Sequence, residues 1–307
     1  MEIILFASNE GGAGQSTVCR FFAEHYAVTE RKRVLAVELG MFYPSFGRLY
    51  PLVQPVSPKA TIDNLLLQDI PEHPQVVQDY VQKTEIENLD VIRSVFNGED
   101  EGIVSRNGLY RGKRDIRKLS DCEEVTCFIS GTVWYAIEEL KNQYDIVLVD
   151  TSTKLSRVTD GFIKKLIEGD ADFHAVTVSP LDFGELMGSL INVLGIIPEE
   201  KQIEIVINPR FTVPDEEIVR ALENRRMIDC LLNLDDARLA PQYQRMRNYL
   251  IQKGGERLSK IRQLYMPYLA GIQRYHFPPF APVHWLEDTR LSQEDIAKFL
   301  FQVPEAV

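Results

Sequence analysis

The residues with the clearest chemical potential form a glycine-rich loop near the start of the chain. The loop contains Gly11, Gly12, Ala13, Gly14, Gln15, Ser16 and Thr17, and it follows the apolar residues 3–7 closely. Glycines at this spacing let backbone N–H groups turn toward a phosphate chain, and a hydroxyl such as that of Ser16 can hold Mg²⁺. The helix expected after the loop would add the positive end of its dipole. The sequence therefore predicts a phosphate-binding backbone.

The same loop lacks the cation that an active phosphate loop carries. Gln15 stands where such a loop has a lysine. Phosphoryl transfer depends on positioning and on neutralising the charge that spreads over the phosphate oxygens. The shape of the site is therefore present in the sequence, but its positive charge is not.

Carboxylates at the ends of two expected strands would lie near this loop. Residues 34–38 end in Glu38, and residues 145–150 end in Asp150. Open α/β sheets bind their ligands at the carboxyl ends of the strands. Asp150 stands where a carboxylate reaches Mg²⁺ through water, so Ser16 and Asp150 are the predicted metal residues if a nucleotide binds.

Strand-like apolar runs alternate with helical patterns along the chain, which predicts an α/β fold: a mostly parallel sheet flanked by helices on both faces. The expected strands are 2–7, 33–38, 89–95, 145–150, 175–179, 203–208 and 227–232. The expected helices after the first crossover are 61–68, 74–82, 133–143, 183–194, 215–223 and 241–265. We expect one α/β domain over residues 1–266, then a proline- and aromatic-rich strap over 267–307 that ends in a short amphipathic helix, 293–301. That last helix would dock on its own domain or touch a partner or membrane.

Composition narrows the range of functions. The chain has 307 residues and a formal net charge of −11, which opposes general attraction to nucleic acid or anionic lipid. One basic stretch, 106–118, is either a solvated loop or a local contact with an acidic partner, lipid headgroups or nucleic acid. No apolar run approaches the roughly 18 residues of a membrane span, and the start lacks a secretory pattern. We therefore expect a cytoplasmic protein with reduced cysteines.

In the order of its motifs the chain resembles the MinD/ParA-type ATPases, a branch of the P-loop NTPases. The glycine loop resembles their deviant Walker A motif, Glu38 the start of their Asp-x-Asp segment, and Asp150 the end of their Walker B strand. Asn208, in Ile207-Asn208-Pro209-Arg210, resembles the asparagine that recognises adenine. The resemblance implies that ATP or ADP with Mg²⁺ is the candidate cofactor, held by the loop residues above and Asn208.

Residues 38–49 and 60–66 are most similar to the TadZ/CpaE branch of that family. Members of this branch position the machinery of Flp (Tad) type IV pili. The resemblance implies partners in a pilus assembly or secretion system, a homodimer, and recruitment to membrane machinery through those partners.

The departures from the family pattern predict a catalytically inactive protein. Family ATPases carry lysines where this chain has Glu10 and Gln15, and a second carboxylate where it has Gly40. Loss of one such cation typically costs several kcal/mol of barrier, about a thousandfold in rate. We therefore assign no catalytic residues and expect a scaffold of pilus or envelope assembly. The alternatives are an ATP-controlled dimerisation switch, in which Arg48 or another basic residue replaces the lysines, and a DNA-binding partition protein that uses residues 106–118.

Overall fold

The computed structural model describes residues 1–40, 45–54, 60–62, 65, 75–94, 123–151, 157–208, 226–233 and 240–266. The chain divides into two compact units. The first contains Met1–Phe6 and Phe22–Phe173, and the second contains Ala7–Phe21 and His174–Val307. Each unit has its own strands and helices and is described by itself.

The first unit is built on the strand order β3-β4-β2-β5-β1. Strands β4, β2, β5 and β1 pair in parallel, and only the short β3 is antiparallel to its neighbour within this part of the sheet. Their bounds are β1 Glu2–Ser8, β2 Val34–Glu38, β3 Gln82–Lys83, β4 Leu89–Ile92 and β5 Ile146–Asp150. Every residue of β2, β4 and β5 is buried, as expected for parallel strands that are covered on both faces.

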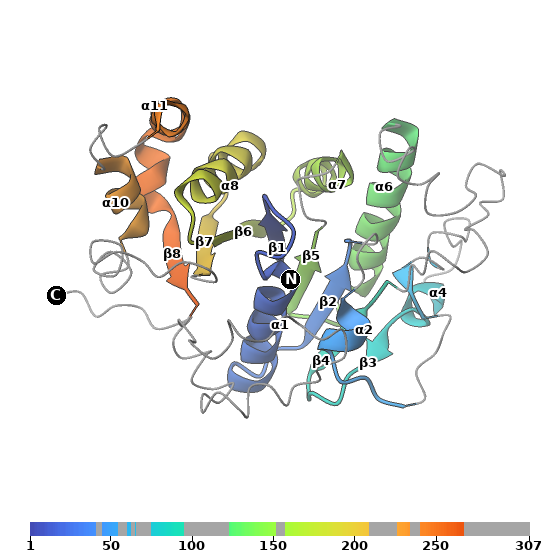
Figure 1. The fold of residues 1–307 in the computed structure, drawn as a ribbon. Helices are drawn as coiled ribbons and strands as arrows, with labels where there is room; N and C mark the ends of the chain where they lie inside the picture. Colours follow the sequence, from blue (N-terminus) through green and yellow to red (C-terminus); the bar gives the residue numbers. More distant parts are fainter. Residues whose placement is uncertain are drawn as a thin grey trace, which may run out of the picture. The chain divides into compact units, whose positions relative to one another are not determined.

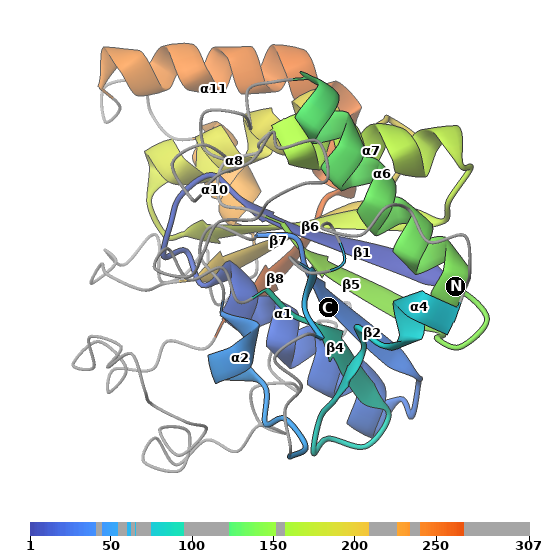
Figure 2. The same ribbon diagram turned by 90° about the vertical axis from the view of Figure 1, so that its right-hand side faces the viewer.

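Two long helices of the first unit pack against each other on one face of its strands. They are α6, Glu123–Leu140, and α7, Arg157–Glu168, and Figures 1 and 2 show them side by side. Two short helices, α2 (Phe46–Leu49) and α4 (Gln75–Gln78), follow β2 in the chain. Phe6 and Phe22 meet edge to face in the core, with ring centroids 5.1 Å apart.

The second unit contains the parallel strands β6-β7-β8. Its strands are β6 Phe173–Pro180, β7 Ile203–Asn208 and β8 Arg262–Tyr265. Its helices are α8 Phe183–Ile196, α10 Met227–Asn233 and α11 Pro241–Gly254, followed by the 3₁₀ turn η3 Gly255–Lys260. Helix α11 lies across α8 (Figure 2). Helix α1, Gln15–Glu24, begins here and continues in the first unit as the π-helical turn η1, His25–Thr29.

The predicted fold class is confirmed, since both units combine mostly parallel strands with helices. One predicted strand is wrong: residues 227–232 form helix α10. The three buried apolar side chains, Met227, Ile228 and Leu231, have helical spacing. Two of the helix's first N–H groups also find acceptors on β8: that of Met227 donates to Tyr265 Oη at 3.1 Å, and that of Ile228 to Gln263 Oε1 at 2.9 Å.

The predicted helix 241–265 is too long. Helix α11 ends at Gly254, and Gly255 follows with a φ of 47°. Glycine tolerates this positive φ, which residues with a side chain rarely adopt. The chain then makes the 3₁₀ turn η3 and enters strand β8, which the sequence pattern did not predict. The sequence pattern also did not predict strand β3 or helix α7.

Several predicted segments fall outside the described residues. They are the helices 215–223 and 293–301, most of the helix 61–68, the basic stretch 106–118 and the strap 267–307. Among the residues that the structure does describe, no helix has the length and apolar character needed to cross a membrane.

Candidate functional site

The glycine loop of the second unit adopts backbone angles that only glycine takes easily. Gly12 has a φ of 83° and Gly14 a φ of 93°. At Gly14 space is limiting as well, because an added Cβ would lie 2.8 Å from Asn208 Nδ2. A side chain at Gly14 would therefore strain the backbone and displace the Asn208 amide, so the loop favours glycine at this position.

Asn208, the last residue of β7, forms a hydrogen bond with the backbone of the glycine loop. Its Nδ2 donates a hydrogen bond to the carbonyl oxygen of Ala13 at 2.9 Å. The structure thus brings Asn208 together with the glycine loop, whereas its contact with adenine stays a prediction. Because this hydrogen bond is with the backbone of the loop, Asn208 stabilises the conformation of the loop.

Gln15, the first residue of α1, points into the protein. Its side chain is buried, with 4% of the residue exposed, and its Oε1 accepts a hydrogen bond from Ser8 Oγ at 2.8 Å. The Ser8 hydroxyl also lies 3.0 Å from the carbonyl oxygen of Glu10. Gln15, which stands where an active phosphate loop has a lysine, therefore forms an uncharged hydrogen bond with Ser8 just before the loop.

The outer part of the loop faces solvent. Glu10, Gly11 and Gly12 are exposed, and an added Cβ at Gly11 would meet no atom within 4 Å. Ser16 and Thr17 are half-buried in the first turn of α1. This backbone fits an anion, since N–H groups at the start of a helix are free of intrahelical partners. The exposed carboxylate of Glu10, however, would repel an anion bound there.

Asn9 fastens the loop to helix α8, a contact that sequence reasoning missed. Its Nδ2 donates to Glu185 Oε2 at 3.0 Å, and its Oδ1 accepts from Asn192 Nδ2 at 2.6 Å. A side chain at Gly188 would approach Asn9 Nδ2 to 3.0 Å. Positions 185, 188 and 192 share one helix face, and this spacing is the signal that was available in the sequence.

In the first unit, Glu38 connects three segments at the carboxyl end of the strands. Its Oε1 accepts hydrogen bonds from Ser45 N, from Ser45 Oγ at 3.0 Å and from Phe46 N at 3.0 Å. Its Oε2 accepts from Ser94 N at 2.8 Å. Glu38 thereby caps the start of α2 and holds the backbone just after β4.

The carboxyl group of Glu38 is buried, with 1% of the residue exposed. Burial raises its pKa to about 7, although the N–H donors of Ser45, Ser94 and Phe46 partly oppose this rise. The carboxylate of Asp150 raises the pKa further, since Glu38 and Asp150 are register partners on β2 and β5. The two predicted carboxylates therefore lie together, and one of them serves the local backbone.

Asp150 is also buried, with 3% of the residue exposed. Its carbonyl oxygen accepts from Leu39 N at 2.9 Å and from Gly40 N at 3.1 Å. Within the described residues, no group of three metal-binding side chains is gathered that could hold an ion by itself. The predicted binding of Mg²⁺ by Ser16 and Asp150, conditional on a bound nucleotide, stays a prediction.

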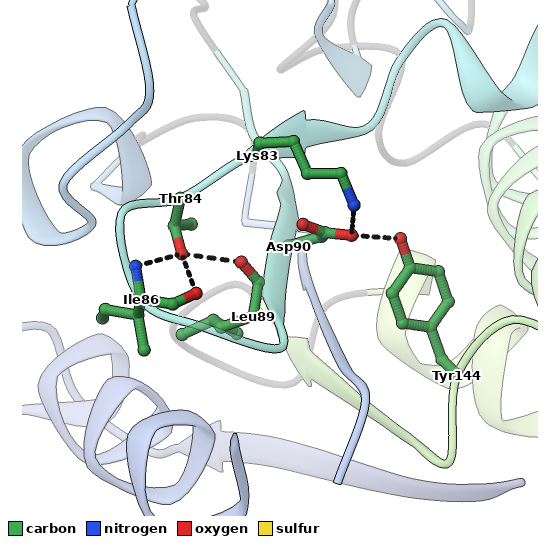
Figure 3. A network of polar contacts seen from close by, with 6 residues as sticks. All are labelled: Lys83, Thr84, Ile86, Leu89, Asp90 and Tyr144. Carbon is green, nitrogen blue, oxygen red and sulfur yellow. Dashed lines mark hydrogen bonds and ion pairs between the residues drawn. The ribbon is translucent and has the colours of Figure 1, made fainter. Parts of the chain in front are cut away.

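A second polar network lies at the opposite, amino end of the strands and was not predicted (Figure 3). Asp90 Oδ2 accepts from Tyr144 Oη at 2.7 Å and contacts Lys83 Nζ at 2.6 Å. Burial, with the nearby Asp90 carboxylate, raises the pKa of Tyr144 above its ordinary value. Beside it, Thr84 Oγ1 donates to the carbonyl of Leu89 at 2.6 Å and closes the β3–β4 turn. The network joins the edge hairpin to β5, which is a structural role.

We compared the sequence and the fold with those of known proteins. No family model matches the chain. Over 208 residues it is 25% identical to a virulence plasmid ParA family protein, pGP5-D, of Chlamydia psittaci, covering 64% of this chain and 68% of the relative. A ParA family ATPase from Chlorobium tepidum superposes with a TM-score of 0.59 at 15% identity, covering 98% of this chain and 99% of that one. The MinD cell division protein of Aquifex aeolicus gives 0.52 at 14% identity, with both chains covered completely.

The mostly parallel strands and the glycine loop before α1 define a P-loop type of α/β protein. More narrowly, the chain has the fold of the ParA and MinD ATPases, as the two superpositions show.

Proposed function

We propose that this protein is a catalytically degenerate relative of the ParA and MinD ATPases that acts as a localisation or assembly scaffold. The observation that carries the proposal is Gln15, whose buried amide bonds Ser8 Oγ at 2.8 Å where an active loop presents a lysine. The exposed carboxylate of Glu10 adds negative charge to the same loop. A phosphoryl-transfer site without cations loses most of its transition-state stabilisation.

The proposed setting is a type IV (Flp/Tad) pilus or a related envelope machine. Support comes from the resemblance of residues 38–49 and 60–66 to the TadZ/CpaE branch. We propose a homodimer in the cytoplasm that protein partners recruit to the membrane. A fluorescent fusion should form a focus in cells with the pilus machinery and become diffuse when that machinery is deleted. A diffuse signal in both strains would remove the pilus assignment.

The enzymatic half of the proposal is tested by phosphate release from ATP in the presence of Mg²⁺. The wild-type protein should show no turnover above a protein-free control. Gln15→Lys discriminates further: in a degenerate site it should raise nucleotide affinity by tenfold or more, since about 1.4 kcal/mol corresponds to a factor of ten. Magnesium-dependent turnover by the wild type at ordinary ATPase rates would refute the proposal.

A second candidate is a nucleotide-controlled switch. The observation in its favour is the retained backbone: Gly12 and Gly14 keep positive φ, and Ser16 stands in the first turn of α1. If ATP or ADP binds, Gly11–Thr17 would hold the phosphates, with Ser16 and Asp150 holding Mg²⁺. In a switch, Gln15→Lys should change affinity only modestly, because another group already supplies the charge.

The third candidate is a DNA-binding partition protein, for which the ParA family name of the Chlamydia relative is the support. It requires residues 106–118 to make salt-sensitive contacts with DNA. Neutralising the six basic residues of that stretch should then abolish DNA binding and leave the fold intact.

A further inference from the structure

Helix α11 carries a stripe of basic and aromatic side chains on its outer surface. Arg245, Tyr249 and Lys253 are exposed and follow one another at intervals of four residues, so they share one face of the helix. We call these three residues the α11 stripe. At a rise of about 1.5 Å per residue, its two cations are about 12 Å apart along the axis. The inner face of α11, with Leu250 and Gly254, is buried where the helix packs on α8.

The charge of this region differs from that of the whole chain. Residues 241–262 contain six basic residues and a single acidic one, whereas the chain has a net charge of −11. Two of these cations are engaged internally: Arg257 donates to backbone carbonyls, and Arg262 pairs with Glu204 at 3.0 Å. Within the described part of the chain, neither Arg245 nor Lys253 forms an ion pair. Both side chains are exposed, so their charges face solvent.

Tyr249 stands between the two cations with 50% of its surface exposed. An exposed tyrosine flanked by basic residues is typical of protein interfaces, where aromatic side chains act as anchors and charges at the rim set the orientation. Tyr249 offers both an apolar ring and a hydroxyl that can hydrogen-bond at low entropic cost. The stripe therefore combines one anchor with two orienting charges.

We propose that the α11 stripe docks an acidic helical segment of a partner protein. Two helices that pack side by side lie about 8–10 Å apart, within reach of side chains on their facing edges. A partner helix with carboxylates eight residues apart and an apolar residue midway would place each carboxylate at a cation and the apolar side chain on Tyr249. This inference does not depend on the state of the nucleotide site.

Other anionic partners fit the stripe less well. Proteins that bind DNA strongly neutralise about 6–10 phosphates, whereas the stripe offers two cations on an acidic molecule. A helix that lies in a lipid interface needs a continuous apolar face. The exposed neighbours of the stripe are instead polar, as at Asn248 and Gln252. A discrete acidic segment is the occupant that the pattern favours.

Fluorescence anisotropy of two labelled helical peptides tests the proposal on the full-length protein. One peptide carries glutamates eight residues apart with a leucine midway, and the other has glutamine in place of both glutamates. The first should bind at low salt and weaken as salt increases, and the second should bind at least tenfold more weakly. A DNA duplex and vesicles containing phosphatidylserine serve as competing probes.

The matched variants are Arg245→Glu/Lys253→Glu and Lys32→Glu/Lys164→Glu. Both pairs change the net charge by the same amount, and all four positions are exposed, but the second pair lies outside α11. The first should lower peptide affinity by about tenfold or more, and the second should leave it nearly unchanged. Tyr249→Ala should weaken binding without removing its salt dependence.

The proposal is overturned if the acidic peptide does not bind, or if both charge-reversed proteins lose affinity equally. It is also overturned if DNA or vesicles bind through Arg245 and Lys253 and the peptide does not. Circular dichroism of each variant establishes that the comparison is made between folded proteins.

Discussion

Two of the predicted or compared positions, Gln15 in helix α1 and Glu38 at the end of β2, carry buried polar side chains. Gln15 turns its carbonyl oxygen inward to Ser8, and Glu38 distributes its two oxygens over the N–H groups of Ser45, Phe46 and Ser94. Neither group is presented to a ligand in this conformation. Gln15 bonds a neighbouring side chain and Glu38 bonds the backbone, so we expect their removal to lower the stability of the fold.

Replacing Gln15 by methionine should lower the free energy of unfolding by about 1–2 kcal/mol. Methionine keeps the side-chain length but leaves the buried Ser8 hydroxyl without its bond to Oε1. Urea denaturation measures the change. Ser8→Ala should cost less in the Gln15→Met background than in the wild type, because only its contact with the Glu10 carbonyl is then left to lose; fully additive losses would show that Ser8 and Gln15 are not coupled.

Glu38 predicts a specific pH dependence of stability. Its pKa in the folded protein is about 7 against an ordinary 4.5, so the folded state binds the proton more tightly than the unfolded state. This contribution to stability is fully present below pH 4.5 and is lost as the pH rises through 7. The loss amounts to about 3 kcal/mol at most, at 1.36 kcal/mol per pKa unit.

Unfolding free energies of the wild type and of Glu38→Gln, measured across this pH range, provide the check. The difference between the two proteins should change steadily between pH 4.5 and 7, because glutamine does not titrate. A difference that is independent of pH would mean that the Glu38 carboxyl group has an ordinary pKa.

At the scale of the elements, the end of helix α8 depends on one arginine. Arg257 Nη1 donates to the carbonyl of Ile197 at 2.8 Å, and its Nη2 to those of Pro198 at 2.5 Å and Lys201 at 3.2 Å. Burial lowers the pKa of Arg257, with Glu199 and Glu200 opposing that shift. One guanidinium thus bonds the carbonyl of Ile197, the C-cap residue of α8, and two carbonyls of the segment that leads to β7.

Arg257→Ala should lower the free energy of unfolding by about 1–3 kcal/mol, because hydrogen bonds from a charged group to partly buried carbonyls are lost. Arg257→Lys should recover only part of this, since an ammonium group cannot span the same acceptors. Urea denaturation with hydrogen exchange over 190–201 distinguishes a local effect from a global one. Full recovery by lysine would show that charge alone is sufficient.

The errors of prediction at this scale have a common physical cause. Central strands such as β2 and β5 were predicted nearly to the residue, because continuous burial leaves a continuous apolar run. Helix α10 was read as a strand because a short apolar run fits either structure, and the side chains that cap it, Gln263 and Tyr265, are far away in the sequence. Tertiary capping of this kind leaves no local signal.

At the candidate site, too, the sequence predicted some features, whereas others depend on tertiary contacts. Motif order predicted the loop, Glu38, Asp150 and Asn208 as site residues, and their binding of a nucleotide or metal stays a prediction. The hydrogen bond from Asn208 to Ala13 and the attachment of Asn9 to α8 depend on which element lies beside the loop. Sequence spacing therefore predicts candidate residues, whereas the contacts that they make depend on tertiary packing.

At the scale of the whole molecule, the chain has the fold of the ParA and MinD ATPases, and its glycine loop contains an uncharged hydrogen bond between Ser8 and Gln15. The loop keeps the positive φ of Gly12 and Gly14, while Gln15 stands where the resemblance implies a lysine. We propose that the fold serves as a framework for protein contacts and that the protein does not turn over nucleotide.

The central claim is tested most directly by isothermal titration of the purified protein with ATP and with ADP in the presence of Mg²⁺, with light scattering to measure mass. We predict little or no heat of binding and a mass that is the same with and without nucleotide. Micromolar affinity together with a nucleotide-dependent change of mass would contradict the account and identify a working switch in which Gln15 is a tolerated replacement.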